Sequence, residues 1–136
     1  MVIDPGTWLP EEFGIPWSDP RHPFHVEHMA MALEEAAAAG KPVFVDFTAA
    51  WCITCLVNER VALETAAARQ AFEKTGTVKL KGDWTNRDPE ITAVLKEVGR
   101  AGVPLYLYWP PKADKPKVLP QVLTEALILS ELGASR

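Results

Sequence analysis

A short apolar stretch, KPVFVDFT at residues 41–48, restricts the possible folds of this chain more than any other feature. Most of its residues are β-branched or aromatic, and both faces are apolar except at Asp46, which is typical of a central strand buried on both sides. A helical pattern precedes it over 24–39 and ends at Gly40, and a second helical pattern runs over 52–63. Because both faces of such a strand need cover, we predict an α/β protein with helices on both faces of a sheet.

The rest of the chain alternates between the same two patterns. We expect a helix over 65–76, a strand over 77–84, a helix over 88–99, strands over 103–109 and 117–119, and a helix over 124–133. Alternating strands and helices predict parallel pairing. The last two strands lie close enough in sequence to form an antiparallel hairpin at one edge, so the expected sheet is mixed overall.

The chain is expected to fold as one domain preceded by an arm. Its 136 residues match the usual length of a single domain. Residues 1–23 contain five prolines, a density that prevents regular helix or central strand. We therefore predict a proline-rich arm or linker over 1–23, whose aromatic residues lie in part against the domain or a neighbour. The folded domain is expected over 24–136.

Charge and hydropathy exclude some classes of function. Fourteen Lys and Arg against eighteen Asp and Glu give a net charge of -4, which argues against a nucleic-acid-binding surface. No apolar run reaches the length of a membrane span. The first twenty residues lack the basic and apolar regions of a signal peptide. The protein is therefore expected to be cytosolic or to be a piece of a larger protein.

Cys52 and Cys55 are the only cysteines in the sequence, and they stand between the buried strand and the second helical pattern. A structural zinc site needs four ligands, but the three histidines lie at or before the start of the first helical pattern, far from the cysteines in sequence, so zinc is disfavoured. Two inert buried thiols are possible, but inert packing gives no reason for the pair to stand at a strand-to-helix junction. The start of a helix stabilises a thiolate, and the Cys-x-x-Cys spacing allows a disulfide to close. The pattern therefore favours a redox pair in which an exposed Cys52 attacks and Cys55 resolves the mixed disulfide.

Two acidic residues stand near the cysteines. Asp46 is a lone carboxylate in a buried strand, six residues before Cys52. A buried carboxylate is energetically costly, so we expect it either to be bonded to another group or to have a function. Because a carboxylate beside a reactive group can move protons, we favour a functional role over a bond to local backbone. Glu59 lies four residues after Cys55 on the same helical face and is aimed back towards it. An exposed glutamate fits this position equally well.

Three segments together carry a resemblance to a known family. VDFTAAWCITC (45–55) and GVPLYLYW (102–109) resemble the thioredoxin superfamily through a buried aspartate, a tryptophan before the cysteine pair and a proline downstream. Glu59 and the stretch LKGDWTNRDPEIT (80–92) look like the C-terminal thioredoxin-like domain of transmembrane thiol:disulfide interchange proteins of the DsbD/ScsB type. The resemblance implies a thioredoxin fold, with a central mixed sheet flanked by helices on both faces.

The resemblance also implies roles for individual residues at the cysteine pair. Cys52 matches the nucleophile of the family and Cys55 the resolving thiol. Asp46 and Glu59 match two acidic residues that tune the cysteines. Trp51 flanks the site and is expected to contact the partner.

A second segment is expected to bind the partner. Pro104 matches a proline that is cis in the family, so we expect a cis Val103–Pro104 bond, although the local sequence alone does not establish one. Val103 matches the residue whose backbone pairs with a bound partner. Ile53-Thr54 and Leu105 depart from the common pattern, which leaves the redox potential and the partner surface open.

In proteins of this type the domain faces the bacterial periplasm, takes electrons from the membrane domain of the same protein and passes them to another thiol domain or partner. By this resemblance we expect a protein-disulfide reductase at the periplasmic face of the inner membrane. No metal or organic cofactor is expected, and the arm over 1–23 would be a tether from the last membrane helix. Two alternatives stay open: a free-standing cytosolic thioredoxin-like reductase, and a thioredoxin-fold binding module with incidental cysteines.

Overall fold

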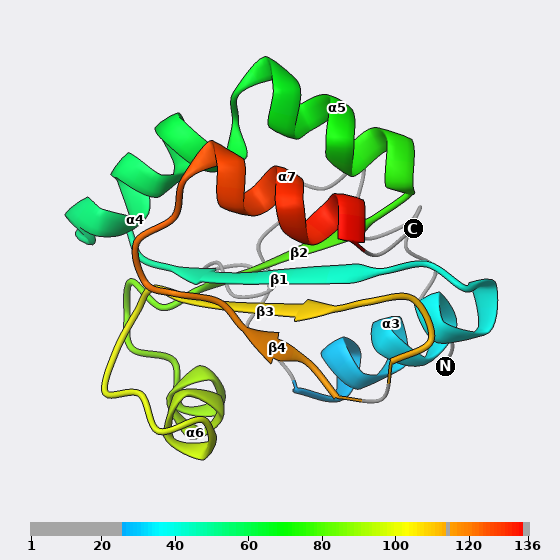
Figure 1. The fold of residues 1–136 in the computed structure, drawn as a ribbon. Helices are drawn as coiled ribbons and strands as arrows, with labels where there is room; N and C mark the ends of the chain where they lie inside the picture. The colour runs from blue at the N-terminus through cyan, green and yellow to red at the C-terminus, as the bar shows by residue number, and fades with distance from the viewer. Residues whose placement is uncertain (1–25, 114, 135–136) are drawn as a thin grey trace.

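The computed structural model describes residues 26–113 and 115–134, and the predicted arm over 1–23 lies outside this range. Figure 1 shows a central sheet with helices above and below it. Along the chain the elements are α3 (Val26–Ala39), β1 (Val43–Thr48), α4 (Ile53–Asn58), the π-helical turn η1 (Glu59–Leu63), α5 (Ala66–Thr75), β2 (Val78–Asp83), α6 (Pro89–Glu97), β3 (Leu105–Trp109), β4 (Lys117–Val118) and α7 (Glu125–Ala134). The described elements occur in the predicted order, and the predicted thioredoxin fold is confirmed.

The four strands form one mixed sheet in the order β2-β1-β3-β4. β1 is central and pairs in parallel with β2, with Val43 opposite Val78. β3 pairs antiparallel with β1, with Phe47 opposite Leu105, and β4 pairs antiparallel with β3. The expectation of parallel pairing throughout the alternating part is therefore wrong for β3. The segment between β2 and β3 brings the chain back to the end of the sheet where β2 finishes, so β3 starts there and runs in the opposite direction.

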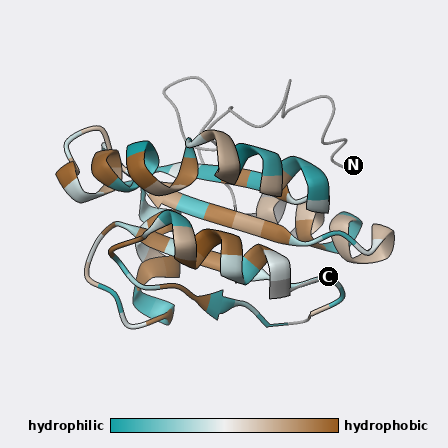
Figure 2. Cartoon of the chain, turned by 45° about the horizontal axis from the view of Figure 1, so that its top comes forward, coloured by the Kyte–Doolittle hydropathy of each residue, from teal (hydrophilic) through white to brown (hydrophobic). Residues whose placement is uncertain are grey.

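Each face of the sheet is covered by its own set of helices. Apolar residues of α3 and α6 pack with alternate β1 residues such as Val45 and Phe47 in one core cluster. Residues of η1, α5 and α7 pack with Phe44 of β1 and Tyr106 and Tyr108 of β3 in a second cluster. In Figure 2 the central strands are largely hydrophobic, whereas the helices and loops carry both hydrophobic and hydrophilic residues. This two-sided burial explains why β1 is apolar on both faces.

The segment predicted as one helix over 52–63 is divided into two parts. Cys52 is not helical but is the N-cap of α4. After Asn58 the chain widens into η1, where the Glu64 N–H donates to the Glu59 carbonyl at 2.8 Å. Such π-helical turns insert an extra residue and are frequent at functional sites. The turn changes which side chains face the sheet after Asn58, and a simple helical period does not predict this.

Gly82 allows β2 to lie close to β1. It is the register partner of Phe47, and a Cβ at this position would be 2.6 Å from the Phe47 ring. The absence of a side chain at Gly82 therefore leaves room for the Phe47 ring within the core that α6 covers.

Candidate functional site

Cys52 and Cys55 form a disulfide at the start of α4, with their Cα atoms 5.3 Å apart. Cys52 has an extended backbone, and its Sγ accepts the Cys55 N–H at 3.1 Å. The Cys52 N–H itself donates to the Ala49 carbonyl at 3.1 Å, which closes the turn after β1. The hydrogen bond from Cys55 places a backbone donor on the sulfur atom that carries negative charge when Cys52 is a thiolate.

The two cysteines differ in access to solvent. The exposed fraction is 7% for Cys52 and 0% for Cys55. Cys52 is therefore the more accessible of the two, but the prediction that it is exposed is wrong for the oxidised state. Ala49 packs in one cluster with both cysteines, and Val103 lies against that cluster.

The Val103–Pro104 segment lies beside the disulfide. The peptide bond between these residues is cis, as the resemblance implies. Pro104 directly precedes β3, whose first residue pairs with Phe47 near the end of β1. The Arg100 guanidinium donates to the Pro104 carbonyl at 3.2 Å and to the Leu119 carbonyl at 3.4 Å. Arg100 therefore links the segment beside the cysteines to Leu119, the residue that follows β4.

Trp51 is held at the surface by the loop between β2 and α6. Its exposed fraction is 47%. Its indole N–H donates to the Thr85 carbonyl at 3.0 Å, and the Ala50 N–H donates to Thr85 Oγ1 at 2.8 Å. The Trp51 ring lies 6.0 Å from the ring of the buried Trp84, measured between centroids. Two loops distant in sequence thus meet at the residue that precedes Cys52.

Asp46 is buried in β1, with an exposed fraction of 8%. Its Oδ1 atom has no hydrogen-bond partner in the described part of the chain. Burial raises the pKa of Asp46 from 3.8 to about 7, with Lys81 opposing the rise and Glu59 adding to it. Asp46 pairs in register with Tyr106 on the α4 side of the sheet, and burial, then the Asp46 charge, raises the pKa of Tyr106. A carboxylate in this environment changes its charge near neutral pH.

Glu59 reaches towards the sheet from the first residue of η1. Its carboxylate accepts a hydrogen bond from Thr48 Oγ1 at 3.4 Å and lies 3.8 Å from the Lys81 ammonium. The alternative of a freely exposed glutamate is therefore wrong, since Glu59 is partly buried and bonded to β1 and β2. Asp46 and Glu59 are brought into one electrostatic group with Lys81 between the sheet and η1.

Asn58 joins α4 to the sheet and to the segment before α7. Its amide nitrogen donates to the Tyr106 hydroxyl at 2.9 Å and to the Gln121 carbonyl at 2.8 Å. Its amide oxygen accepts the Leu123 N–H at 3.0 Å. Because Asn58 immediately precedes η1, this satisfied polar network fixes the point where the helix changes its winding.

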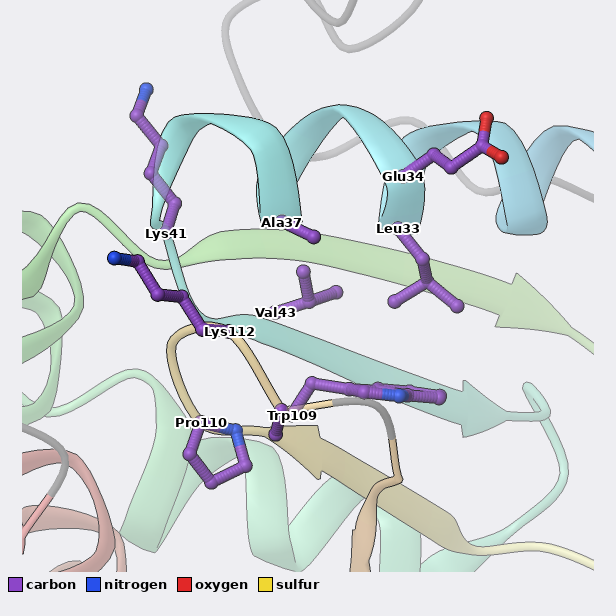
Figure 3. Close-up of a pocket in the computed structure, with 9 residues that line it drawn as sticks. Leu33, Glu34, Ala37, Lys41, Val43, Trp109, Pro110 and Lys112 are labelled. Carbon is purple, nitrogen blue, oxygen red and sulfur yellow. The ribbon is translucent and has the colours of Figure 1, made fainter.

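A surface hollow of about 260 Å³ lies at the opposite end of the sheet from the cysteines. Val43 and Trp109, which are register partners, line it, and they stand at the far ends of β1 and β3. Figure 3 shows Leu33 and Val43 directed into the hollow and two lysines, Lys41 and Lys112, at one side of it. It is therefore separate from the disulfide.

The part of the chain that the structure describes contains neither a metal-ligand cluster nor a membrane-spanning helix. Over residues 26–113 and 115–134, no three His, Cys, Asp or Glu side chains are grouped so that they could hold a metal ion. None of the described helices has the length and apolar character needed to cross a membrane.

The comparison with family models decides the family. The thioredoxin-like model matches residues 26–111, which contain the sheet core, the cysteine pair and Pro104. The chain belongs to the thioredoxin-like family.

Several relatives and solved structures that are similar to this thioredoxin-like chain are DsbD proteins. The thiol:disulfide interchange protein DsbD of Vibrio cholerae is 35% identical over 86 residues, which cover 62% of this chain and 14% of that protein. The C-terminal domain of DsbD from Neisseria meningitidis in the oxidised form superposes with a TM-score of 0.62 at 27% identity, covering 82% of this chain and 92% of that one. Its reduced form gives 0.60 at 25% identity, covering 79% and 96%.

These comparisons confirm the predicted resemblance and support a thiol:disulfide oxidoreductase. The thioredoxin-like chain spans only 14% of the length of its Vibrio relative. The structure brings Trp51, Val103 and Pro104 to the cysteine pair, and it places Asp46 and Glu59 together between the sheet and the helix that follows the pair. Their roles stay predictions.

Sequence reasoning missed several residues that shape the site. They are Asn58, Lys81, Trp84, Thr85, Arg87 and Arg100. Four of them belong to the stretch 80–92, which the resemblance singled out as a block without assigning any role within it. The available signal was an alternating strand pattern that ends in a tryptophan and is followed by polar residues and a helix cap. It did not reveal that this loop touches Trp51.

Proposed function

We propose that this chain is a thiol:disulfide oxidoreductase that reduces disulfides in protein partners by dithiol–disulfide exchange. The observation that carries the proposal is the Cys52–Cys55 disulfide at the start of α4, packed against Val103 in a thioredoxin-like domain. No other group is needed for the chemistry, because the cysteine pair itself carries the two electrons.

The reaction begins with the reduced pair. The Cys52 thiolate attacks one sulfur of the partner disulfide, forms a mixed disulfide and releases the other partner sulfur as a thiolate. The Cys55 N–H hydrogen bond to Cys52 Sγ stabilises the attacking thiolate. The greater exposure of Cys52 supports its assignment as the attacking residue.

The second step releases the reduced partner. Cys55 loses its proton, attacks the Cys52 sulfur and forms the intramolecular disulfide, while the second partner sulfur leaves as a thiolate and takes up a proton. The partner gains two electrons and the cysteine pair loses two. Asp46 is the proposed proton acceptor for Cys55, because it titrates at about 7 and lies on the α4 side of the sheet.

Apolar side chains around the disulfide support a protein partner. Trp51, Ile53, Leu56, Val57 and Val61 are all exposed on the active-site loop, α4 and η1. Surfaces of this kind commonly bind other proteins. They extend from the loop at the cysteine pair along α4 and η1, so a partner that reaches Cys52 comes close to them.

The finer proposal is that the chain serves as a domain of a larger protein. Electrons would come from a membrane domain of the same protein and pass to periplasmic thiol partners, with the chain at the periplasmic face of the bacterial inner membrane. The relation to DsbD supports this proposal. The coding sequence upstream of Met1 tests it: a frame that continues through several membrane spans is expected, and an isolated gene for a free-standing protein would contradict it.

Reduction of insulin by dithiothreitol tests the chemistry. The protein should accelerate insulin precipitation, and Cys52→Ser should remove the acceleration while leaving the far-ultraviolet circular dichroism spectrum unchanged. Acceleration that survives in Cys52→Ser, or none in the wild type, would mean that the cysteines are incidental to a binding module.

A further inference from the structure

An arginine side chain lies against two tryptophans next to the disulfide. The Arg87 guanidinium carbon is 5.0 Å from the centroid of the Trp51 ring and 5.0 Å from that of Trp84. The two rings are tilted by 53° to each other. Both distances are within the range of cation–π attraction. Trp51 directly precedes Cys52, so Arg87 contacts the residue next to the reactive pair.

The backbone at Arg87 is held in an unusual conformation. Its φ is 54°, in the left-handed region that few non-glycine residues adopt. The Arg87 N–H donates to the Trp84 carbonyl at 2.9 Å, which closes the turn. Such a conformation persists where surrounding contacts determine it, and it is enriched at functional sites. Here it directs the side chain back over the tryptophans.

The guanidinium keeps donors available for an outside group. The N–H groups of a guanidinium lie in its plane, and cation–π attraction to a ring does not use them as hydrogen-bond donors. Arg87 is exposed, and it forms no ion pair with any residue in the described ranges. The neighbouring carboxylates are engaged: Asp83 Oδ1 accepts from Thr85, and Asp88 Oδ1 accepts the Glu90 and Ile91 N–H groups.

We infer that Arg87 is a specificity residue that binds a carboxylate of the partner segment carrying the disulfide attacked by Cys52. This inference rests on the proposed function. The preferred partner would be an acidic protein segment, with Asp or Glu near its cysteine. The protein has a net charge of -4, so the attraction of an acidic segment comes from the Arg87 cation locally and not from the overall charge. Arg is suited to this task because its fork matches a carboxylate.

Two matched peptides test the inference. Each has one cysteine joined by a disulfide to 2-thiopyridine, and the peptides differ only in the two residues flanking that cysteine, which are Glu in one and Gln in the other. The reduced protein is mixed with each peptide, and the release of thiopyridone gives the rate. In the wild type the Glu peptide should react about twofold to fivefold faster than the Gln peptide, the range of an exposed ion pair. High salt should reduce this ratio.

Substitutions separate charge recognition from loop support. Arg87→Gln should lower the rate for the Glu peptide more than the rate for the Gln peptide, until the ratio of the two rates is one or less. Arg87→Lys, which keeps the charge but not the fork, should give an intermediate ratio. Arg69→Gln is the charge-matched control, since Arg69 is exposed on α5, and it should keep the wild-type ratio.

Each contrary result has its own meaning. A wild-type ratio of one, or an equal fall for both peptides in Arg87→Gln, would overturn the inference and leave the proposed function intact, because the stack would then only support Trp51. Release from neither peptide with the reduced wild type would overturn the proposed function and the inference with it.

Discussion

Replacing Asp46 with asparagine should make the oxidised protein progressively more stable relative to the wild type as the pH rises from about 4 to about 8. The pKa of Asp46 is raised from 3.8 to about 7 in the fold, first by burial. Between these values the folded protein holds a proton on Asp46 that the unfolded chain has released. Unfolding therefore releases that proton, and the free energy of unfolding falls as the pH rises through this window. Asparagine does not ionise and removes the fall.

The size of the effect follows from the pKa. Each tenfold change in proton affinity is worth about 1.4 kcal/mol, so the raised pKa of Asp46 costs the fold about 4 kcal/mol above pH 7. The asparagine side chain would carry N–H donors in a buried position where Asp46 Oδ1 has no hydrogen-bond partner in the described part of the chain. A buried donor without an acceptor lowers the free energy of unfolding by about 1–3 kcal/mol at every pH. The constant penalty cancels when two pH values are compared. The variant should therefore gain about 2–4 kcal/mol relative to the wild type between pH 4 and pH 8.

Urea denaturation of the oxidised wild type and Asp46→Asn across this pH range is the assay. The two curves of unfolding free energy against pH should diverge as the pH rises. Glu73→Gln removes an exposed carboxylate of α5 and should follow the wild-type curve. Parallel curves for Asp46→Asn and the wild type would refute the reasoning, since they would mean that Asp46 ionises alike in the folded and unfolded states.

Three further substitutions probe the site and its support. Glu59→Gln should shift the alkylation of reduced Cys52 by iodoacetamide to lower pH, because it removes a negative charge that opposes the thiolate; an unchanged pH profile would reduce Glu59 to a structural residue. Asn58→Ala should lower the free energy of unfolding, measured in urea, by about 2–4 kcal/mol, because three hydrogen bonds of a buried side chain are lost, and a change below about 1 kcal/mol would contradict this. Gly82→Ala should cost about 1–3 kcal/mol through its close contact with a core ring, whereas Gly133→Ala, which meets no atom within 4 Å, should cost nothing; equal thermal midpoints would contradict this.

The strands were predictable from local patterns, but the direction of β3 was not. The stretch 41–48 has the two-sided apolar character that a central strand requires, and it forms β1. Alternation of strands and helices says which elements exist, yet it does not say at which end of the sheet a connection returns. The pairing of Phe47 with Leu105 depends on that return, which packing of α6 against the sheet determines.

The parts of the site that could be predicted are those where a residue type has few possible roles at its position in the sequence. A Cys-x-x-Cys pair at a strand-to-helix junction and a carboxylate inside an apolar strand are both informative, and both lie where the sequence indicates. The burial of Cys52 was not predicted because it depends on Ala49 and Val103, which are brought together only by the fold. The contact of Arg87 with Trp51 was missed for the same reason, since these residues belong to different loops.

Mixed-disulfide trapping tests the central claim most directly. Reduced Cys55→Ser and reduced Cys52→Ser are incubated with oxidised glutathione, and intact mass spectrometry measures the fraction of each protein that carries glutathione. Cys55→Ser should accumulate the adduct on Cys52, because attack proceeds and the resolving thiol is absent. Cys52→Ser should trap little, because Cys55 has an exposed fraction of 0%. Equal trapping by both variants, or trapping mainly by Cys55, would contradict the assignment of Cys52 as the attacking cysteine.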